Sequence, residues 1–482
     1  MALNFGDRAM MIGGEWVTGD QWIDSVNPAN EELIGRVPAG TAADVDRAVA
    51  AAAAAQPAWA ALSIWERRDR LRAVGAAIKA RAEEIKLMEA ADSGNTIGNL
   101  NGDLYKASNH FDYFAGLLTE LKGETIPASP GGLHMTIREP YGVVGRIVPF
   151  NHPFMFATAN MAAPLAAGNS VILKTPETSP LSATIVGEIC RELLPAGVVN
   201  IVSGYGLPVG DRIARHPQVR RIGFTGSVGT GLAIQRAAAE TCVKHVTLEL
   251  GGKNPLIIYP DADLEAAISG AVAGMNFAWA GQSCGSTSRI LVHESLYKKA
   301  VELCTAKVEA IRVGDPLDPA SQMGPVNSAG HLARIEALVS AGLAEGARAT
   351  TGGGRPKGSE FERGFWFAPT VLADVKPGMR IALEEVFGPV MTIIPWSTEE
   401  EAIQIANETE FGLTASVWTQ DIDRALRAAR RIHSGVVTVN GTKMHFVGTP
   451  FGGHRNSGLG GEECLEELMS FTEVKSLHIM VK

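Results

Sequence analysis

The sequence predicts an α/β fold with two domains built on mostly parallel sheets and one small β element. Between residues 142 and 260, short runs of β-branched residues alternate with helix-like segments of roughly 10–15 residues. Strand–helix–strand repetition of this kind is typical of a doubly wound parallel sheet. A second alternation follows residue 284, and it predicts a second α/β domain.

Composition and charge exclude several classes of protein. The chain has 482 residues, of which 46% are hydrophobic and 20% charged, as in globular proteins with sizeable cores. A net charge of −9 without a basic block argues against a nucleic-acid binder or a polybasic membrane binder. We find no secretory signal and no run of about 18 apolar residues. Five cysteines without a CxxC pair indicate neither a disulfide framework nor a zinc site, and we expect a reducing, cytoplasmic compartment.

The N-terminal third is predicted to be mainly helical. Thr41 and Asp44 form a capping signal at the start of the helical region 40–120. Prolines and glycines near Gly131 then predict a turn between two short strands, so we interpret 122–140 as a projecting hairpin.

Polar or glycine-rich residues follow four strands of the first predicted sheet. The expected strands are 143–148, 170–174, 198–202, 221–224, 246–250 and 256–259. Asn151, Lys174, Gly226 and Glu249 lie at or just beyond the ends of four of them. Because ligands bind beyond the carboxyl ends of parallel strands, four such loops on one edge predict a ligand site.

Two of these loops suit a dinucleotide. The glycine-rich stretch 226–231 opens a helix, where backbone N–H groups favour a phosphate, although it lacks the GxGxxG fingerprint. The stretch 204–206 also lacks the fingerprint, and a tight turn is the alternative for both. Lys174 and Glu177 can hold the hydroxyls of an adenosine ribose, and a carboxylate there repels a 2′-phosphate, which favours NAD over NADP. A surface ion pair is the alternative.

The second domain is expected to contain strands at 290–292, 368–372, 391–395, 414–418 and 436–440. Helices are expected at 295–311, 399–408 and 421–432, a loop at 352–354, and a solvated helix face at the acidic cluster 462–467. Cys284 lies between small residues at the junction of the two α/β regions, where a deprotonated thiol has room to attack a substrate carbon. The alternative is an inert buried thiol, as we expect for Cys190, Cys242, Cys304 and Cys464.

Several stretches, taken in order, resemble the aldehyde dehydrogenase superfamily over nearly the whole chain. They are PFN at 149–151, KTPE at 174–177, FTGS at 224–227, LELGGK at 248–253, GQSC at 281–284, EVFGP at 385–389 and PFGG at 450–453. The resemblance implies a Rossmann-type NAD-binding domain (1–121 and 141–250), a catalytic domain (251–448) and a β oligomerisation element (122–140 and 466–482). It also implies a homodimer or homotetramer.

The resemblance implies a catalytic role for three residues. Cys284 attacks the aldehyde to give a thiohemiacetal, which loses hydride to NAD and leaves a thioester. Asn151 and the Cys284 backbone N–H hold the oxyanion, Glu249 activates the hydrolytic water, and no metal is required. The residues expected to bind the cofactor are Phe150, Lys174, Glu177, Gly204, Phe224, Gly226, Ser227, Glu385 and Phe387.

The resemblance also places a substrate pocket, whose expected lining is His152, Met155, Phe156, Ala159, Trp279, Ser283, His445 and Phe451. This wall is apolar and aromatic and has no arginine, which predicts a bulky apolar or aromatic aldehyde; ordinary hydrophobic packing is the alternative. Phe150 replaces the tryptophan of many relatives, and the stretch from Glu249 to Cys284 is one residue longer than usual. Glu473 is assigned a secondary role as a relay.

Glu249 favours hydrolysis to the free carboxylic acid, because members that transfer the acyl group to CoA generally lack this glutamate. A CoA-acylating dehydrogenase stays as the alternative enzyme. A catalytically idle binding or structural protein on the same fold is the alternative from another class.

Overall fold

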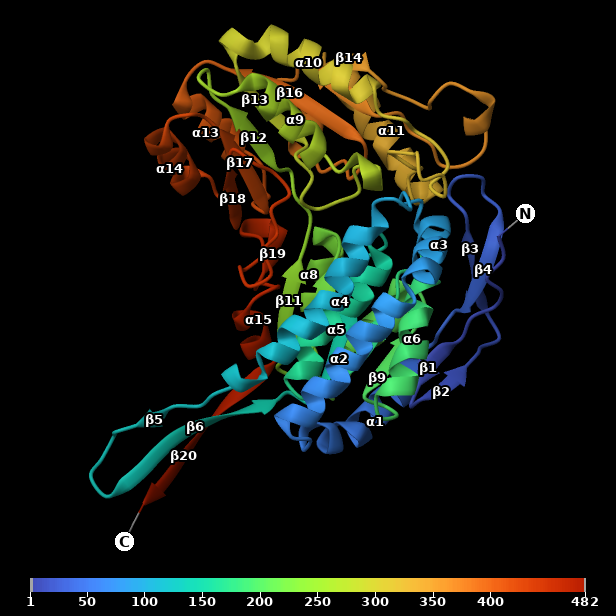
Figure 1. Ribbon diagram of the computed structural model, residues 1–482, viewed down its shortest axis with the longest axis vertical. Helices are drawn as coiled ribbons and strands as arrows, with labels where there is room; N and C mark the ends of the chain where they lie inside the picture. The colour runs from blue at the N-terminus through green and yellow to red at the C-terminus, as the bar shows by residue number, and fades with distance from the viewer. Residues whose placement is uncertain (1–2, 481–482) are drawn as a thin grey trace.

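The computed structural model describes residues 3–480 and contains two large sheets, a three-stranded sheet and a two-stranded sheet (Figure 1). The first sheet has the order β19-β11-β10-β7-β8-β9-β1-β2. Its strands are β1 (Met10–Ile12), β2 (Glu15–Val17), β7 (Val143–Ile147), β8 (Ser170–Lys174), β9 (Val199–Val202), β10 (Val219–Thr225), β11 (His245–Glu249) and β19 (Gly458–Leu459). The central five strands are parallel, as the sequence predicts.

Helices cover both faces of the first sheet. They are α1 (Ala42–Ala60), α2 (Ile64–Ala80), α3 (Ala82–Ser93), α4 (Leu100–Gly116), α5 (Pro153–Ala166), α6 (Ser182–Leu193), α7 (Asp211–Arg215) and α8 (Val228–Ala239). One buried cluster joins α2 to α6 with β8 and β9, and a second joins α1, α7 and α8 to the other face. Thr41 and Asp44 cap α1 in the predicted reciprocal arrangement.

The register of the parallel strands aligns their carboxyl ends. Ile147 lies opposite both Lys174 and Phe224, and Thr225 lies opposite Glu249. The chain therefore leaves four neighbouring strands at one edge of the sheet, and the predicted site loops begin there.

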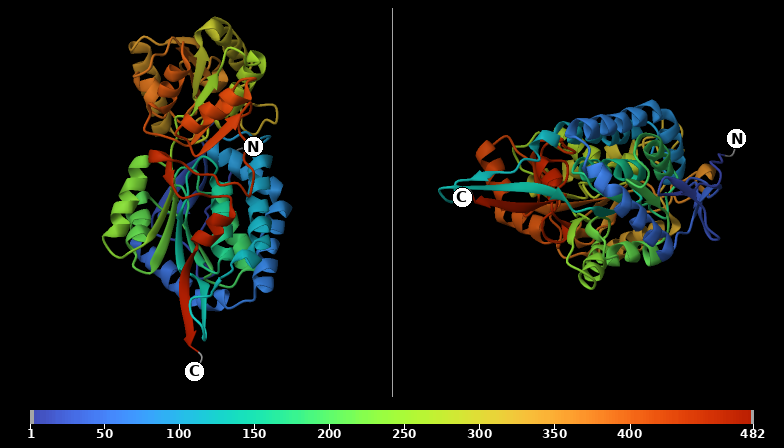
Figure 2. Two further views of the ribbon diagram at one scale, coloured as in Figure 1. Left: turned by 90° about the vertical axis from the view of Figure 1, so that its left-hand side faces the viewer. Right: turned by 90° about the horizontal axis from the view of Figure 1, so that it is seen from below.

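The second large sheet has the order β14-β15-β16-β13-β12-β17-β18 and is parallel except for β14. Its strands are β12 (Pro255–Ile258), β13 (Arg289–His293), β14 (Arg348–Thr351), β15 (Thr370–Ala373), β16 (Val390–Trp396), β17 (Thr414–Trp418) and β18 (Val436–Val439). Its helices are α9 (Leu264–Gly274), α10 (Tyr297–Glu309), α11 (Ala329–Ala344), α12 (Arg380–Leu383), α13 (Glu399–Asn407) and α14 (Ile422–Arg431). Figure 2 shows the two large bodies one above the other, with the chain crossing between them.

The predicted hairpin projects from the molecule and pairs with the last strand (Figures 1 and 2). The hairpin strands are β5 (Thr125–Ile126) and β6 (Gly132–Pro140), and β20 (Thr472–Met480) runs antiparallel to β6 along its whole length. The two-stranded sheet of β3 (Trp22–Val26) and β4 (Leu33–Pro38), like β1 and β2, has no counterpart in the sequence prediction. Among residues 3–480, no helix is both long and apolar enough to cross a membrane.

The prediction of a solvated acidic helix face near the C-terminus is wrong for two of its four glutamates, whereas Glu466 is exposed. Glu463 and Glu467 are buried, at 5% and 4% exposure, beside the helix α15 (Leu465–Ser470). Glu463 forms an ion pair with Lys106, and Glu462 forms one with the buried Arg146 at 2.9 Å. The distant Lys106 explains why Glu463 can be buried, whereas the buried Glu467 accepts from the Glu463 N–H at 2.6 Å.

Candidate functional site

A cavity of about 930 Å³ opens at the carboxyl ends of β7, β8, β10 and β11. All four predicted loops line it, and residues from the second large sheet's domain close its other side. Cys284, Glu249 and Asn151 all line this cavity, although they come from three segments far apart in the sequence. The expected cluster of catalytic side chains is therefore present as a spatial arrangement.

Cys284 lies on a loop that follows the short helical turn Phe277–Trp279 and precedes β13. Gly281 allows this loop to pass close to the neighbouring chain, because a Cβ there would come within 2.2 Å of the Gly388 carbonyl. Its φ of +70° also favours glycine. The buried Asn254 donates hydrogen bonds to the carbonyls of Cys284 and Ser286, at 2.7 and 2.9 Å, and so fixes the loop.

The Cys284 thiol is half-buried, and its pKa lies well above the ordinary value because of burial and the nearby charge of Glu249. Cys190, Cys304 and Cys464 are buried and Cys242 is partly exposed, and none of these four lines the cavity.

Glu249 is the last residue of β11 and is 5% exposed. Its Oε1 atom has no hydrogen-bond partner among residues 3–480. Burial, followed by the charge of Glu462, raises the pKa of Glu249 well above its usual range. A carboxyl group with a raised pKa is suited to proton transfer near neutral pH.

Asn151 lies in the turn between β7 and α5 and is 4% exposed. Its side-chain Nδ2 donates to the carbonyl of Gln282, two residues before Cys284, at 2.9 Å. An asparagine amide nitrogen carries two hydrogens, so a second donor stays available beside the thiol loop. The backbone N–H of Cys284 donates to no group within residues 3–480.

Eight of the nine expected cofactor residues line the cavity. They are Phe150, Lys174, Glu177, Phe224, Gly226, Ser227, Glu385 and Phe387. Gly204 does not line it: this residue is buried in the turn after β9, where a Cβ would meet Val209 at 2.5 Å. Its neighbour Gly206 lines the cavity instead.

The side chains at the predicted ribose position are held together. Lys174 is 3% exposed, and its Nζ donates to Glu177 at 2.9 Å and to the Thr175 carbonyl at 3.0 Å. Ser227 is the N-cap of α8 and accepts from the Thr230 N–H at 3.3 Å, so the start of this helix faces the cavity.

At the other end of the cavity, the Gly252 N–H donates to Glu385 at 2.8 Å. Burial raises the pKa of Glu385 to about 7. Phe387 packs against Phe150 and His331, with ring centroids 5.9 and 5.8 Å apart. His331 and Arg334, both in α11, were missed, because nothing in their local sequence marks a ligand site.

Of the eight expected substrate residues, only Phe156 is among the residues that line the cavity, and the other seven lie in separate groups. His152 contacts the rings of Phe156 and Trp279, with centroids 5.9 and 5.1 Å apart, and His445 stacks on Phe451 at 4.5 Å. Ser283 is half-buried beside Cys284, whereas Met155 and Ala159 are buried in α5.

The wall is less apolar than predicted. The Asp103 carboxylate bonds His152 Nδ1 at 2.8 Å and accepts from the Trp279 indole at 3.4 Å. Lys443 lies 5.6 Å from the Trp279 ring centroid. Asp103 and Lys443 were missed because their places beside these aromatic residues depend on contacts between distant segments.

The structure contradicts the relay assigned to Glu473. This side chain is exposed on β20, opposite Glu139 of the projecting hairpin, and does not line the cavity.

The chain is similar to known proteins in both sequence and structure. The family model described as "Aldehyde dehydrogenase family" matches residues 16–477. Aldehyde dehydrogenase tropH of Talaromyces stipitatus is 42% identical over 479 residues, covering 98% of this chain and 93% of that protein. A putative aldehyde dehydrogenase from Burkholderia cenocepacia has a TM-score of 0.96 at 41% identity, with 98% of each chain covered. PnpE, solved in complex with nicotinamide adenine dinucleotide, also has a TM-score of 0.96, at 39% identity and 98% coverage of both chains.

The chain matches this family in sequence and in fold over nearly its full length. It also brings a thiol, a carboxyl and an amide together in one cavity. The chain belongs to the aldehyde dehydrogenase family and is an NAD-linked enzyme that oxidises an aldehyde.

Proposed function

We propose that the protein oxidises a bulky apolar or aromatic aldehyde to the free carboxylic acid, with NAD as its cofactor. The observation that carries this proposal is the convergence of Cys284, Glu249 and Asn151 on one cavity. These three groups supply a nucleophile, a base and an oxyanion donor, which are the parts that acyl chemistry on a thiol needs.

The cavity fits a dinucleotide. The start of α8 offers free N–H groups for the pyrophosphate. The preceding Gly226 is required there, because a Cβ would come within 2.4 Å of the Phe224 ring. Glu177 and Lys174 offer a carboxylate and an ammonium to the adenosine ribose, and the carboxylate disfavours a 2′-phosphate. We assign the nicotinamide half to Glu385 and Phe387.

The chemistry follows from the placement of the side chains. The deprotonated Cys284 thiol adds to the carbonyl carbon, and the Asn151 amide together with the Cys284 backbone N–H stabilises the resulting oxyanion. Nicotinamide, held by Glu385 and Phe387, would supply the hydride acceptor that converts the Cys284 thiohemiacetal into a thioester. Glu249 then takes a proton from water, which attacks the Cys284 thioester and releases the acid.

Phe156, which lines the cavity, supports an aromatic substrate, because aromatic rings pack well edge to face, as the His152 ring does against Phe156. Asp103 lies behind His152 and Trp279 and holds both through hydrogen bonds, which keeps these rings in place.

Assembly into a homodimer or homotetramer is part of the proposal. The edge strand β20 carries exposed apolar side chains, with Val474 at 58% and Ile479 at 51% exposure. A reducing, cytoplasmic compartment also belongs to the proposal, since all five cysteines are free thiols.

An aldehyde panel tests the function. We expect the protein to form NADH with benzaldehyde and to release benzoate, with kcat/KM at least about ten-fold above that for succinic semialdehyde. A ten-fold preference for the semialdehyde would refute the substrate class, and benzoyl-CoA formed on addition of CoA would select the acylating alternative. Parallel assays with NADP measure the cofactor preference.

Cys284→Ala is the matched variant for this assay. It should lower turnover by more than about 10³-fold and leave NAD binding within about two-fold, because the thiol forms the bond to substrate. Cys242→Ala, a partly exposed thiol outside the cavity, should behave like the unmodified protein. Loss of activity in both variants would contradict the assignment of the nucleophile.

A further inference from the structure

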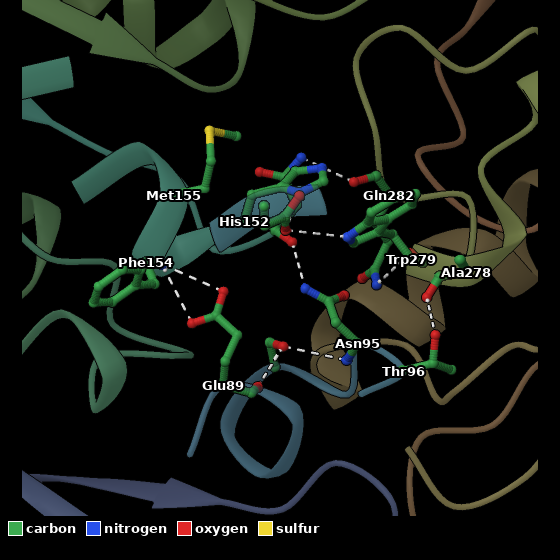
Figure 3. Close-up of polar contacts among 12 residues, drawn as sticks. Glu89, Asn95, Thr96, His152, Phe154, Met155, Ala278, Trp279 and Gln282 are labelled. Atoms are coloured by element: carbon green, nitrogen blue, oxygen red, sulfur yellow. Dashed lines mark hydrogen bonds and ion pairs between the residues drawn. The ribbon is translucent and has the colours of Figure 1, made fainter. Parts of the chain in front are cut away.

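A buried polar network at the end of α3 joins Glu89 and Asn95 to the turn before α5, and Thr96 to the loop that contains Ala278 (Figure 3). The helix ends at Ser93, and Gly94 follows in the left-handed conformation, with φ at 83° and its N–H donating to the Ala90 carbonyl. A Cβ at Gly94 would lie 3.0 Å from Pro28 and Pro325, so this turn needs glycine. The turn directs Asn95 and Thr96 toward the site.

Asn95 holds the main chain of the oxyanion turn. It is 2% exposed, and its side-chain Nδ2 donates to the Asn151 carbonyl at 2.8 Å. The Asn95 N–H donates to the Ser93 hydroxyl at 3.2 Å, and that hydroxyl donates to the Glu89 carbonyl at 2.6 Å. Both the main chain and the side chain of Asn95 are therefore fixed relative to α3.

The same helix also holds the far side of the turn. Both carboxylate oxygens of Glu89 accept from the Phe154 N–H at 3.3 Å, at the start of α5. Asn151 and Phe154 are thus anchored to one helix, and the turn between them cannot shift without breaking buried hydrogen bonds.

The next residue reaches the loop of the nucleophile. The backbone N–H and the hydroxyl of Thr96 both donate to the Ala278 carbonyl, at 3.5 and 3.3 Å. Gln282 Nε2 donates to the Trp279 carbonyl at 3.1 Å, and the Gln282 carbonyl accepts from Asn151. The segment 93–96 therefore contacts the oxyanion turn on one side and the Cys284 loop on the other.

We propose that Asn95 is a positioning residue for aldehyde oxidation: its amide fixes the Asn151 main chain, so that one Asn151 Nδ2 hydrogen is held on Gln282 and the other is directed to the oxyanion. This inference rests on the proposed function. The position of the Asn151 amide matters because an oxyanion donor acts only when it lies at hydrogen-bond distance from the developing charge.

Asn95→Asp tests the inference with almost no change in volume. The substitution removes the N–H donor and places a carboxylate against the Asn151 carbonyl, which pushes the turn away. We expect kcat to fall about 10- to 100-fold, since small misplacements near the reacting atoms cost that much, with little change in KM or in NAD affinity. Alkylation of Cys284 by iodoacetamide should keep its rate, because that reaction forms no oxyanion. Asn95→Ala, which leaves no charge, should show the same pattern.

A double-mutant cycle separates positioning from general destabilisation. On an Asn151→Ala background, Asn95→Asp should change kcat by less than about two-fold, because the group that it positions is gone. Effects that multiply in the double variant would overturn the inference.

Asn200→Asp is the matched control. Asn200 is fully buried in β9, and its Nδ2 donates to the Gly197 carbonyl at 2.8 Å, outside the cavity lining. We expect its kcat to match that of the unmodified protein. A fall in kcat equal to that of Asn95→Asp would overturn the positioning role, whereas an unmodified protein that forms no NADH from any aldehyde would overturn the proposed function itself.

Discussion

At the scale of single residues, the site brings two proton-holding groups together, the buried Glu249 carboxyl and the half-buried Cys284 thiol. Burial raises the pKa of the Cys284 thiol and of the Glu249 carboxyl, and a negative charge on Glu249 further raises that of the thiol. Both groups must lose a proton before they act, Cys284 as nucleophile and Glu249 as base. The rate is therefore controlled by protonation as well as by geometry.

Glu249→Gln should separate these steps. We expect a burst of NADH followed by a steady-state rate lowered by about 10²–10⁴-fold, because glutamine cannot accept the proton of the hydrolytic water. In the unmodified protein, kcat/KM should rise with pH toward the alkaline side, since the raised pKa values of both groups keep them protonated at low pH. Stopped-flow absorbance across pH checks both points, and an unchanged steady-state rate would count against the assigned role.

At the scale of elements, the end of α3 buries two carboxyl groups among helix starts. Glu89 meets the N–H of Phe154, and Asp92 accepts from Leu181 at 2.7 Å, just before α6. Backbone N–H groups at the start of a helix favour a carboxylate, yet the low polarity of the interior opposes its charge. Burial dominates, and it raises the pKa of Glu89 to about 8 and that of Asp92 to about 7.

These values predict how stability changes with pH. Between the ordinary carboxyl pKa and the raised one, folded Glu89 keeps a proton that the unfolded chain has lost, so stability falls as pH rises through this window. The slope from one such group is at most about 1.4 kcal/mol per pH unit. Glu89→Gln removes the titration and still offers an oxygen to Phe154.

Chemical unfolding from pH 5 to pH 8 measures the effect. As pH increases over this range, the free energy of unfolding of Glu89→Gln should increase relative to that of the unmodified protein. Parallel pH dependences in the two proteins would show that Glu89 does not titrate there.

At the scale of the whole molecule, the cavity exists because residues of two sheets meet. The first sheet contributes aligned strand ends and Glu249, whereas Cys284 and Glu385 come from the chain around the second sheet. The three-stranded sheet projects from the molecule (Figure 2), and none of its residues lines the cavity. It carries the exposed apolar edge that we assign to assembly.

Ile479→Glu should weaken assembly without affecting the fold. The substitution removes the apolar contact of Ile479 and places a charge in the interface, and both changes weaken binding. We therefore expect light scattering to show a shift to smaller species. Val243→Glu is the control, because Val243 is 86% exposed in a loop outside the projecting sheet. An oligomer that persists in Ile479→Glu, or that dissociates equally in both variants, would exclude this edge as the contact.

Much of the architecture follows from local patterns. Strands such as 170–174 and 199–202 are short runs rich in β-branched residues, and the motifs around Asn151, Glu249 and Cys284 carry their chemistry in the residue types themselves. The strands β1 to β4 went unpredicted although β1 pairs with β2 and β3 with β4 as neighbours in the sequence; only the pairing of β1 with β9 joins distant residues.

The sequence by itself determined the fold class, the order of the motifs and the set of reactive groups, because strand periodicity and side-chain chemistry are written residue by residue. Only the tertiary structure decided that Asn95 holds Asn151, that Asp103 holds His152 and that Glu463 is buried against Lys106. Each of these contacts joins residues that are far apart in the chain, and a hydrogen bond or ion pair of that kind leaves no trace in the spacing of either partner.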